Sequence, residues 1–456
     1  MKLLQQISGT IETLASEGSG VISRPEGKPY LVYNTIPGET VNATVVKRTG
    51  DGHRARLDDV VESSSDRVMP HCPYAGTCGG CKWQHIDYTR QLGEKLKRLQ
   101  SVFTVAGVPC PTESVVPCPD QYFYRNRMDF VFGRDGELGL KLPDRWWATL
   151  DLKTCFLLSE ESVGIVNDVR AWAKSTGLPF WNNKTHEGFF RYLVIREGKN
   201  TGERMVTLVT SSHPTGLLAS GPQSLTNLIG TRATSIVHGI NNRITDLSVS
   251  DEIIPLKGEP WIHEIVNGVT YKITPNAFFQ TNTVMATQLQ NTALRHCEEV
   301  EGRRSNLSVL DLYCGSGFFS LALAKQNPTM RVMGIEENAE AIACAKENAF
   351  TNQINAEYFV SKAESFDWTS YAPDIVILDP PRGGMHPDVI ETLLRVKPKT
   401  IIYVSCKYER FLQEFTGTPT HPIGLSTAYD LRQATALDLF PHTPHIELVI
   451  RLDLRP

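Results

Sequence analysis

The segment Ser308-Val-Leu-Asp-Leu-Tyr-Cys-Gly-Ser-Gly-Phe-Phe-Ser-Leu-Ala-Leu-Ala324 decides the fold of the C-terminal part of the chain. A short apolar run, a turn from Gly315 to Gly317 and a longer apolar run predict a strand, a tight turn and a helix of an α/β domain. Glycines in such a turn let the backbone approach a ligand closely. A Gly-x-Gly turn alone is weak evidence, because an ordinary connection between a strand and a helix has the same pattern.

Three further apolar runs each end in a polar residue where a strand should end: 331–336 in Glu336, 374–379 in Asp379, and 400–406 in Cys406. An acid at the end of the second strand can bind the two hydroxyls of a ribose. Open α/β sheets bind ligands beyond the carboxyl ends of their strands, so these three residues and Tyr313 are predicted to converge on one crevice. The sequence therefore predicts a nucleotide-like cofactor site with a thiol beside it.

Length and composition fit a globular protein of two or three domains. The chain has 456 residues, of which 41% are hydrophobic and 21% are charged. It contains no run of eighteen apolar residues, and its first residues lack the apolar core of a signal peptide, so we expect a cytoplasmic protein without a membrane segment. A net charge of −4 argues against a uniformly basic nucleic-acid binder, so a surface for nucleic acid would have to be local.

We expect three domains. Residues 1–62 consist of short alternating runs broken by glycine and proline, which predicts a small β-barrel, either a plain structural one or one that binds oligonucleotides. Residues 63–272 mix strand-like and helical patterns and predict an α+β domain, in which Leu92 to Phe103 form an amphipathic helix with a basic flank at Lys95, Lys97 and Arg98. Its segment 122–130 mixes aromatic residues with arginines, which suits RNA contacts but also an ordinary strand. Residues 273–456 form the α/β domain.

The ten cysteines are unevenly spread, and Cys72, Cys78 and Cys81 lie together in a glycine-containing loop. Clustered cysteines in a cytosolic chain bind metal or catalyse more often than they form disulfides. A fourth ligand must come from elsewhere, and Cys155 is the best candidate. The other candidates are Cys110 and Cys118, and, for zinc, His71 or His85. Four thiolates suit a structural zinc ion or a [4Fe-4S] cluster, and the ligand types alone do not choose between them.

The C-terminal part of the chain contains five motifs in a fixed order: Phe278-Phe-Gln-Thr-Asn282, Asp311-Leu-Tyr-Cys-Gly-Ser-Gly317, Asp379-Pro-Pro-Arg382, Ser405-Cys406, and Asp438-Leu-Phe-Pro-His-Thr-Pro-His-Ile-Glu447. The same motifs occur in this order in RNA uracil-C5 methyltransferases, and the chain resembles that family over nearly its whole length. The cysteine loop is similar to the iron-sulfur motif of the family's ribosomal-RNA members and some of its transfer-RNA members, and the N-terminal region resembles its TRAM domain.

The resemblance implies a Rossmann-like class I methyltransferase domain that binds S-adenosylmethionine. It implies cofactor contacts at Gln280, Tyr313, Glu336 and Asp379, a nucleophile at Cys406, a base at Glu447, and a [4Fe-4S] cluster on Cys72, Cys78, Cys81 and Cys155. The substrate is expected to be RNA, with ribosomal RNA favoured over transfer RNA, and the protein is expected to be a monomer. The family's nucleophile usually precedes Asn-Pro, whereas Cys406 precedes Lys407-Tyr408, which puts the geometry of that loop in doubt.

The expected chemistry explains these residue types. Uracil C5 is a poor nucleophile until a thiolate adds to C6, and a base must then remove the C5 proton so that the thiol can leave. A uracil inside a stack must first swing out of it. Alternatively, Cys406 is a buried apolar filler and Glu447 a surface carboxylate. The sequence also leaves three other functions open: a methyltransferase for exocyclic amines, an iron-sulfur protein that only binds RNA and, least in keeping with its cysteine spacing, a radical enzyme.

Overall fold

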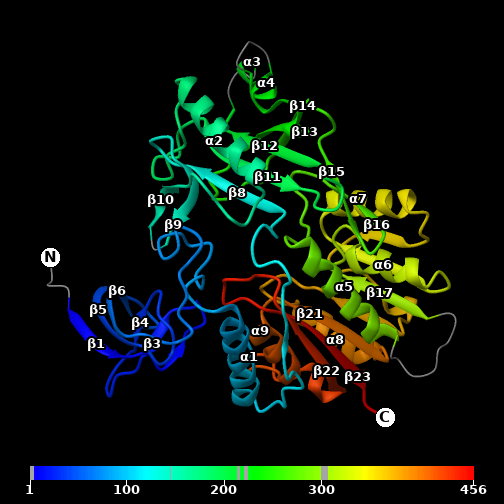
Figure 1. Cartoon of the computed structure of the whole chain (residues 1–456). Helices are drawn as coiled ribbons and strands as arrows, with labels where there is room; N and C mark the ends of the chain where they lie inside the picture. Colours follow the sequence, from blue (N-terminus) through cyan, green and yellow to red (C-terminus); the bar gives the residue numbers. More distant parts are fainter. Residues whose placement is uncertain (1–4, 144, 213–215, 220–223, 299–306) are drawn as a thin grey trace.

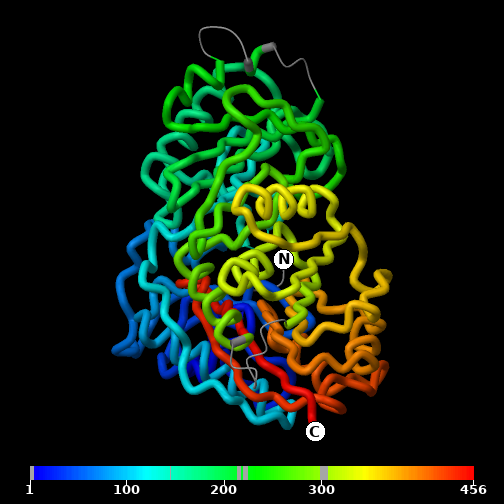
Figure 2. Tube along the Cα trace, turned by 90° about the vertical axis from the view of Figure 1, so that its right-hand side faces the viewer, coloured from blue at the N-terminus to red at the C-terminus, as the bar shows by residue number. Residues whose placement is uncertain are grey.

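The computed structural model describes residues 5–143, 145–212, 216–219, 224–298 and 307–456. Figure 1 shows three parts: a sheet near the N-terminus in blue, a central sheet in cyan and green, and a C-terminal sheet flanked by helices in yellow to red. Figure 2 shows the same parts from the side, with the central part above the other two. In the described ranges, no helix has the length and apolarity needed to span a membrane.

The C-terminal sheet has eight strands in the order β19-β18-β17-β20-β21-β23-β22-β7. Its strands are β7 (Val115–Val116), β17 (Ser308–Leu312), β18 (Arg331–Glu336), β19 (Glu357–Val360), β20 (Ile375–Leu378), β21 (Thr400–Ser405), β22 (Tyr429–Leu437) and β23 (Glu447–Leu454). The five strands from β19 to β21 are mutually parallel, whereas β23 is antiparallel to both of its neighbours, β21 and β22. The strand order reverses between β17 and β20, which is where open parallel sheets form a ligand crevice.

Two separate apolar cores cover the two faces of this sheet. One face packs against helices α5, α6 and α7 and the hairpin β15–β16. The other packs against α1, α8 and α9. The bounds of these elements are α1 (Tyr88–Val105), β15 (Ile262–Val266), β16 (Val269–Ile273), α5 (Thr283–Glu298), α6 (Phe318–Gln326), α7 (Ala339–Thr351), α8 (Pro387–Val396) and α9 (Tyr408–Thr416), with short helical turns η2 (Thr369–Tyr371) and η3 (Leu425–Thr427).

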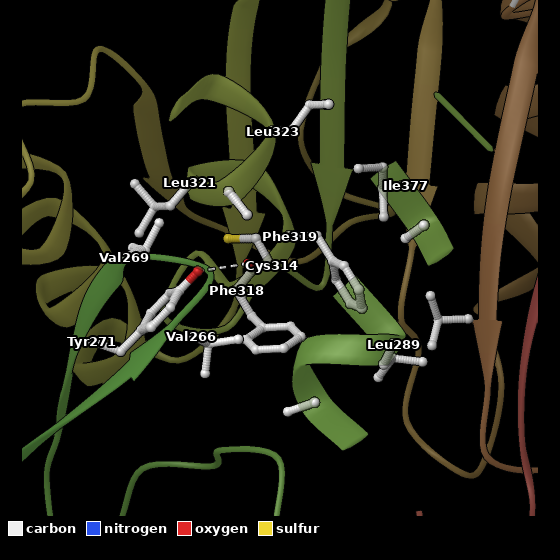
Figure 3. Close-up of a cluster of buried hydrophobic side chains, with 14 of the residues drawn as sticks. Val266, Val269, Tyr271, Leu289, Cys314, Phe318, Phe319, Leu321, Leu323 and Ile377 are labelled. Atoms are coloured by element: carbon white, nitrogen blue, oxygen red, sulfur yellow. Dashed lines mark hydrogen bonds between the residues drawn. The ribbon is translucent and has the colours of Figure 1, made fainter. Parts of the chain in front are cut away.

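Figure 3 shows the first of these cores beside the glycine turn. The hydroxyl of Tyr271 donates a hydrogen bond to the carbonyl oxygen of Phe318 at 2.9 Å, which fastens the hairpin to the start of α6. The sulfur of Cys314 lies in this core, and the side chain is 4% exposed. Cys314 therefore faces apolar packing rather than the crevice, which confirms the expectation for a cysteine inside this turn.

The central part is built on a seven-stranded mixed sheet in the order β10-β9-β8-β11-β12-β13-β14. Its elements are β8 (Arg127–Phe132), β9 (Leu138–Leu142), β10 (Arg145–Asp151), α2 (Glu160–Ser175), β11 (Phe190–Glu197), β12 (Arg204–Thr210), α3 (Gly216–Ala219), α4 (Leu225–Ile229), η1 (Gly230–Arg232), β13 (Ser235–Ile240) and β14 (Glu252–Lys257). Every residue of β11 is buried: α2 and α4 cover one face of this sheet with an apolar core, and Tyr192 and Val194 belong to a second cluster of buried apolar residues.

The N-terminal part is a six-stranded sheet around a small apolar core. Its strands are β1 (Gln6–Thr10), β2 (Thr13–Leu14), β3 (Gly20–Ile22), β4 (Tyr30–Val32), β5 (Thr40–Arg48) and β6 (His53–Glu62). The strands pair antiparallel except β4 with β6, which are parallel. An all-β region therefore occupies the residues for which the sequence predicted a small barrel.

Helix α1 joins the N-terminal and C-terminal parts and lies between them in Figure 1. The carbonyl oxygens of Ser16, Glu17 and Gly18 accept hydrogen bonds from Arg98 (3.0 Å), Lys82 (2.8 Å) and the indole of Trp83 (3.0 Å), respectively. Arg98 also forms an ion pair of 2.6 Å with Glu409 at the start of α9. Because α1 and β7 pack with the C-terminal sheet, residues of the predicted central domain take part in the C-terminal core; the three-domain division itself stays a prediction.

Candidate active site

The carboxyl ends of the parallel strands bring several ionisable side chains together. Cys406 follows β21 directly, Asp379 follows β20, and Glu447 begins β23. The charges of Asp379, Glu447 and Arg382 act on the thiol of Cys406, and those of Asp379 and Arg382 act on Glu447. These four side chains therefore share one electrostatic environment at this edge of the sheet.

The pairing of β21 with β23 explains why Cys406 and Glu447 are neighbours. Ser405 lies opposite Leu448 in this antiparallel pair, so one step further along each strand brings residue 406 opposite residue 447. Directly opposed residues of an antiparallel pair point to the same face, with Cβ atoms about 5 Å apart. A thiol and a carboxyl group are thus placed side by side by the backbone itself.

The thiol of Cys406 is half-buried and stands just before the N-terminus of α9. Burial, together with the negative charges of Glu447 and Asp379, raises the pKa of Cys406 to about 11, while Arg382 acts in the opposite direction. The N–H groups at the start of a helix also favour a thiolate. The segment after the cysteine is fixed without the Asn-Pro pair, because the amide of Lys407 donates to the hydroxyl of Ser405 at 3.2 Å and Tyr408 is buried.

Both carboxyl groups beside the thiol hold their protons unusually tightly. Burial raises the pKa of Asp379 to about 7, with a further contribution from the charge of Asp311. Burial and the charge of Asp379 raise the pKa of Glu447 well above its usual range. Glu447 is 4% exposed, so it is not a surface carboxylate. A carboxyl group with a raised pKa is suited to accept a proton near neutral pH.

The loop that carries Asp379 and Arg382 is held from behind by Glu414 of α9. One carboxylate oxygen of Glu414 accepts hydrogen bonds from the amide of Met385 at 2.7 Å and from Arg410 at 3.0 Å. The other accepts one from the hydroxyl of Tyr403 at 2.6 Å. The side chain is buried, so these bonds fix the loop to the helix that follows the nucleophile candidate.

The cofactor side of the crevice lies at the ends of β17 and β18. Glu336 accepts hydrogen bonds from the amides of Gly315 (3.3 Å) and Asn338 (2.9 Å), which hold its carboxylate beside the glycine turn. A Cβ atom on Gly315 would meet no heavy atom within 4 Å, so the backbone there borders open space. Tyr313 adopts a left-handed conformation with φ of 66°. These features fit a ligand that approaches the turn closely and contacts an acid with its hydroxyl groups.

Gln280 is buried in the segment that leads into α5. The backbone carbonyl oxygen of Gln280 accepts a hydrogen bond of 2.8 Å from the side-chain amide of Asn126. The backbone amide of Asn126 donates to the backbone carbonyl oxygen of Thr281 at 2.9 Å. Arg127 of the same segment pairs with Asp129 at 2.8 Å. Part of the aromatic and basic segment 122–130 therefore has a structural role, tying the central sheet to the cofactor segment, whereas Phe123 remains 41% exposed.

The cysteine loop lies against the central part, and its thiols lie near one another. Cys72, Cys78 and Cys81 each interact electrostatically with Cys155. Burial raises the pKa of Cys81 to about 12 and raises those of Cys78 and Cys155. Across the described ranges, however, no three or more histidine, cysteine, aspartate or glutamate side chains are arranged to hold a metal ion.

The structure also contains functional candidates that sequence reasoning missed. Glu414 gave no signal, because a glutamate in an amphipathic helix usually faces solvent. The expectation that Lys95 belongs to an exposed basic flank of its helix is wrong: it is 1% exposed and forms an ion pair of 2.6 Å with Asp438. The presence of Asp438 in the last of the motifs was the one available hint.

The architecture and the crevice define a class of protein, and comparisons with known proteins agree. Residues 263–455 match the family model described as tRNA (Uracil-5-)-methyltransferase. A crystal structure of Pyrococcus abyssi tRNA (uracil-54, C5)-methyltransferase in complex with S-adenosyl-L-homocysteine superposes with a TM-score of 0.80 at 33% identity, covering 98% of this chain and 99% of that one. The fold is that of a methyltransferase.

Similarity over the whole length identifies the family. The tRNA (uracil(54)-C(5))-methyltransferase of Pyrococcus horikoshii is 34% identical over 97% of this chain and 99% of its own length. The Pyrococcus abyssi protein of the same description is 35% identical over 97% and 99%. The chain belongs to the RNA uracil-C5 methyltransferases and is an S-adenosylmethionine-dependent enzyme that acts on RNA.

Proposed function

We propose that this enzyme forms 5-methyluridine in transfer RNA, with Cys406 as nucleophile and Glu447 as base. The observation that carries this assignment is the β21–β23 register, which extends to place residue 406 opposite residue 447. A methyltransferase for exocyclic amines has no use for a thiol beside a buried carboxyl group. The pairing therefore favours chemistry at a ring carbon.

In the proposed reaction the thiolate of Cys406 forms a bond to C6 of a uracil that has swung out of its stack, and the electron pair moves toward C5. S-Adenosylmethionine supplies the methyl group, which leaves sulfur and bonds to C5. C5 then carries both the methyl group and a hydrogen. Glu447 in its ionised form takes that proton, the C5–C6 double bond forms again, and the bond between carbon and the sulfur of Cys406 breaks.

The resting protonation state makes activation of the thiol a distinct step. With its pKa raised to about 11, Cys406 carries a proton in the free enzyme at neutral pH, and this proton passes to solvent water before the sulfur bonds to C6. Arg382 and a backbone hydrogen bond lower the pKa of this thiol, and the N–H groups at the start of α9 also favour the thiolate. Asp379, between β20 and Arg382, is assigned to the boundary between cofactor and base, and Gln280, Tyr313 and Glu336 to the cofactor.

The sequence favoured ribosomal RNA as the substrate, whereas we propose transfer RNA. The two relatives compared above are both described as tRNA enzymes specific for uracil 54, and they cover nearly the whole chain. Uridine 54 is accordingly the proposed target. Liquid chromatography and mass spectrometry of RNA from a strain lacking the gene should show 5-methyluridine missing from tRNA and retained in rRNA. Loss from rRNA alone would contradict the assignment.

We further propose that Cys72, Cys78, Cys81 and Cys155 bind a [4Fe-4S] cluster and that residues 1–62 are a TRAM-like domain. The four thiols interact with one another, and the amide of Gly80 donates to the sulfur of Cys78 at 3.4 Å, as backbone amides do toward cluster thiolates. Four neighbouring thiolates suit a [4Fe-4S] cluster or zinc, and the cluster is proposed because the loop resembles the iron-sulfur motif of the family.

A covalent trap tests the assignment of the nucleophile. In the presence of S-adenosylmethionine, RNA that carries 5-fluorouridine at the target position should form a covalent adduct with the enzyme that survives denaturation. The adduct persists because C5 then carries fluorine in place of the hydrogen that the base removes. The adduct should map to Cys406 by peptide mass spectrometry and disappear in Cys406→Ala. Methyl transfer without any adduct would contradict the mechanism.

A further inference from the structure

We propose that one face of α1 positions the general base, with Lys95 and Gln91 as positioning residues that hold the loop between β22 and β23. This inference rests on the proposed role of Glu447. The loop comprises residues 438–446 and ends where β23 begins, at Glu447. It has no regular secondary structure, so other elements must fix its path.

The first attachment is a buried ion pair. The ammonium group of Lys95 lies 2.6 Å from a carboxylate oxygen of Asp438, and both side chains are 0% exposed. Lys95 also donates to the carbonyl oxygen of Phe440 at 3.2 Å. The hydroxyl of Tyr88 donates to the other oxygen of Asp438 at 3.0 Å. Asp438 and Phe440, two of the first three residues of the loop, are thus bound to α1.

The second attachment lies in the middle of the loop, at His442. The amide of His442 donates to the side-chain oxygen of Gln91 at 2.9 Å, and the side-chain nitrogen of Gln91 lies 3.1 Å from Nδ1 of His442. The carbonyl oxygen of His442 accepts a hydrogen bond of 2.9 Å from the amide of Trp83, just before α1. The backbone of His442 is left-handed, with φ of 64°, so the surrounding contacts hold a conformation that a histidine seldom adopts.

These contacts come from one stripe of the helix. Tyr88, Gln91 and Lys95 are spaced three and four residues apart, which places them on the same face. Gln91 and Lys95 are almost completely buried. A buried ion pair is weak evidence for stability, because desolvation offsets most of the Coulomb attraction. Its clearest effect is to restrict the groups around it to one conformation. Here the restricted segment is the start of the loop that leads into β23.

The consequence concerns the last chemical step. The register with β21 fixes the backbone of Glu447. The path of the loop sets the direction from which the chain enters β23, and this direction affects where the carboxyl group of Glu447 points. A displacement of about 1 Å at a reacting group costs roughly 10²-fold in rate. Loosening the loop should therefore slow removal of the C5 proton more than attack by Cys406, which stands on a different strand.

The test measures product and covalent protein–RNA adduct together on unmodified tRNA, with Gln91→Met and Lys95→Met. We expect kcat to fall about 10²-fold while the adduct, normally transient, accumulates, because release becomes slower than methyl transfer. Partial unfolding would lower product and adduct together. The double variant Lys95→Met/Asp438→Asn removes the unpaired carboxylate, so it should recover thermal stability without recovering the rate of release.

Glu94→Gln is the matched control, because Glu94 is buried on the same helix but pairs with Arg90 at 2.8 Å instead of the loop. It should release product at the normal rate. Hydrogen exchange without RNA supplies a second measurement: Gln91→Met should speed exchange in residues 438–447 and leave β21 unchanged. The positioning role is overturned if Gln91→Met leaves hydrogen exchange in residues 438–447 unchanged. It is also overturned if Gln91→Met and Lys95→Met slow turnover without accumulating the covalent adduct while Glu447→Gln does accumulate the adduct. If Glu447→Gln itself gives no adduct, the proposed base is wrong, and the exchange data alone decide whether α1 holds the loop.

Discussion

The crevice around Cys406 and the cysteine loop around Cys81 contain the same kind of group in different settings. Burial raises the pKa of the thiol in both places. At Cys406 the negative charges of Glu447 and Asp379 raise the pKa further, but a cation, Arg382, opposes the rise, and α9 begins two residues after the thiol. At Cys78 and Cys81 the neighbouring charges are those of other cysteines, which raise the pKa further.

The difference lies in the groups that favour a thiolate at each place. At position 406 the charge of Arg382 and the N–H groups at the start of α9 favour it, against burial and the charges of Glu447 and Asp379. Four adjacent thiolates in the cysteine loop can exist together only when a cation or a cationic cluster shares their charge. Substitutions at the two sites should therefore have different consequences, and the largest is expected at the crevice.

The largest effect is expected for Cys406→Ala. Without the thiol the enzyme cannot raise the electron density at C5, so methyl transfer should fall at least about 10³-fold. The measurement is transfer of labelled methyl groups from S-adenosylmethionine to tRNA. The control is Cys344→Ala, which removes a buried thiol in α7 and should retain activity. It tests whether the loss of any buried cysteine lowers activity. Substantial activity in Cys406→Ala would remove the basis of the comparison.

Cys81→Ser should disable the other site. It should abolish the visible absorbance of an iron-sulfur cluster in anaerobically purified protein and lower Tm by about 5 °C or more, because a ligand that binds only the folded state is lost. Binding of S-adenosylmethionine, measured by calorimetry, should persist. Cys110→Ser, at one of the thiols outside the loop, is the control. If the wild-type protein binds zinc and no iron, the cluster proposal is wrong and the site holds a structural zinc ion.

Glu414→Gln tests whether the crevice depends on its own supports. The substitution keeps the shape but weakens the bonds to Arg410, Met385 and Tyr403, so we expect the free energy of unfolding to fall by about 1–3 kcal/mol. Activity should fall by about tenfold, because the loop with Asp379 and Arg382 loses its anchor. Glu391→Gln, on the exposed side of α8, should change neither quantity. Urea unfolding and steady-state kinetics provide the two measurements.

The last expected effect concerns stability rather than activity: Asp311 makes the free energy of unfolding depend on pH. Burial raises the pKa of this carboxyl group from 3.8 to about 7. The folded state therefore binds its proton more tightly than the unfolded state, and the contribution to stability is present at low pH and is lost as pH rises from about 4 to about 7. The slope should be at most about 1.4 kcal/mol per pH unit. Asp311→Asn should reduce the slope in urea titrations of the free enzyme and leave the contributions of Asp379 and Glu447, and an unchanged slope would contradict the assignment.

The ends of the parallel strands could be predicted from the sequence, because buried parallel strands form apolar runs and their carboxyl ends share one edge. This rule alone predicts that Tyr313, Glu336, Asp379 and Cys406 lie at the same edge of the sheet. The pairing of Cys406 with Glu447 could not be found in this way, since it depends on the register of strands some forty residues apart. Lys95 was misplaced for a related reason: an amphipathic pattern identifies the apolar face, but it does not reveal a partner for a lysine beside that face.

The junction between the N-terminal sheet and α1 bears on how this protein can change over evolutionary time. Arg98, Lys82 and Trp83 recognise main-chain carbonyl groups, so substitutions at Ser16 and Glu17 should leave the attachment intact. Gly18 is the exception: its φ is +97°, and a Cβ atom there would lie 2.8 Å from the indole nitrogen of Trp83. The sequence of this stretch can therefore drift while one glycine, with no chemistry of its own, stays indispensable to the assembly of the enzyme.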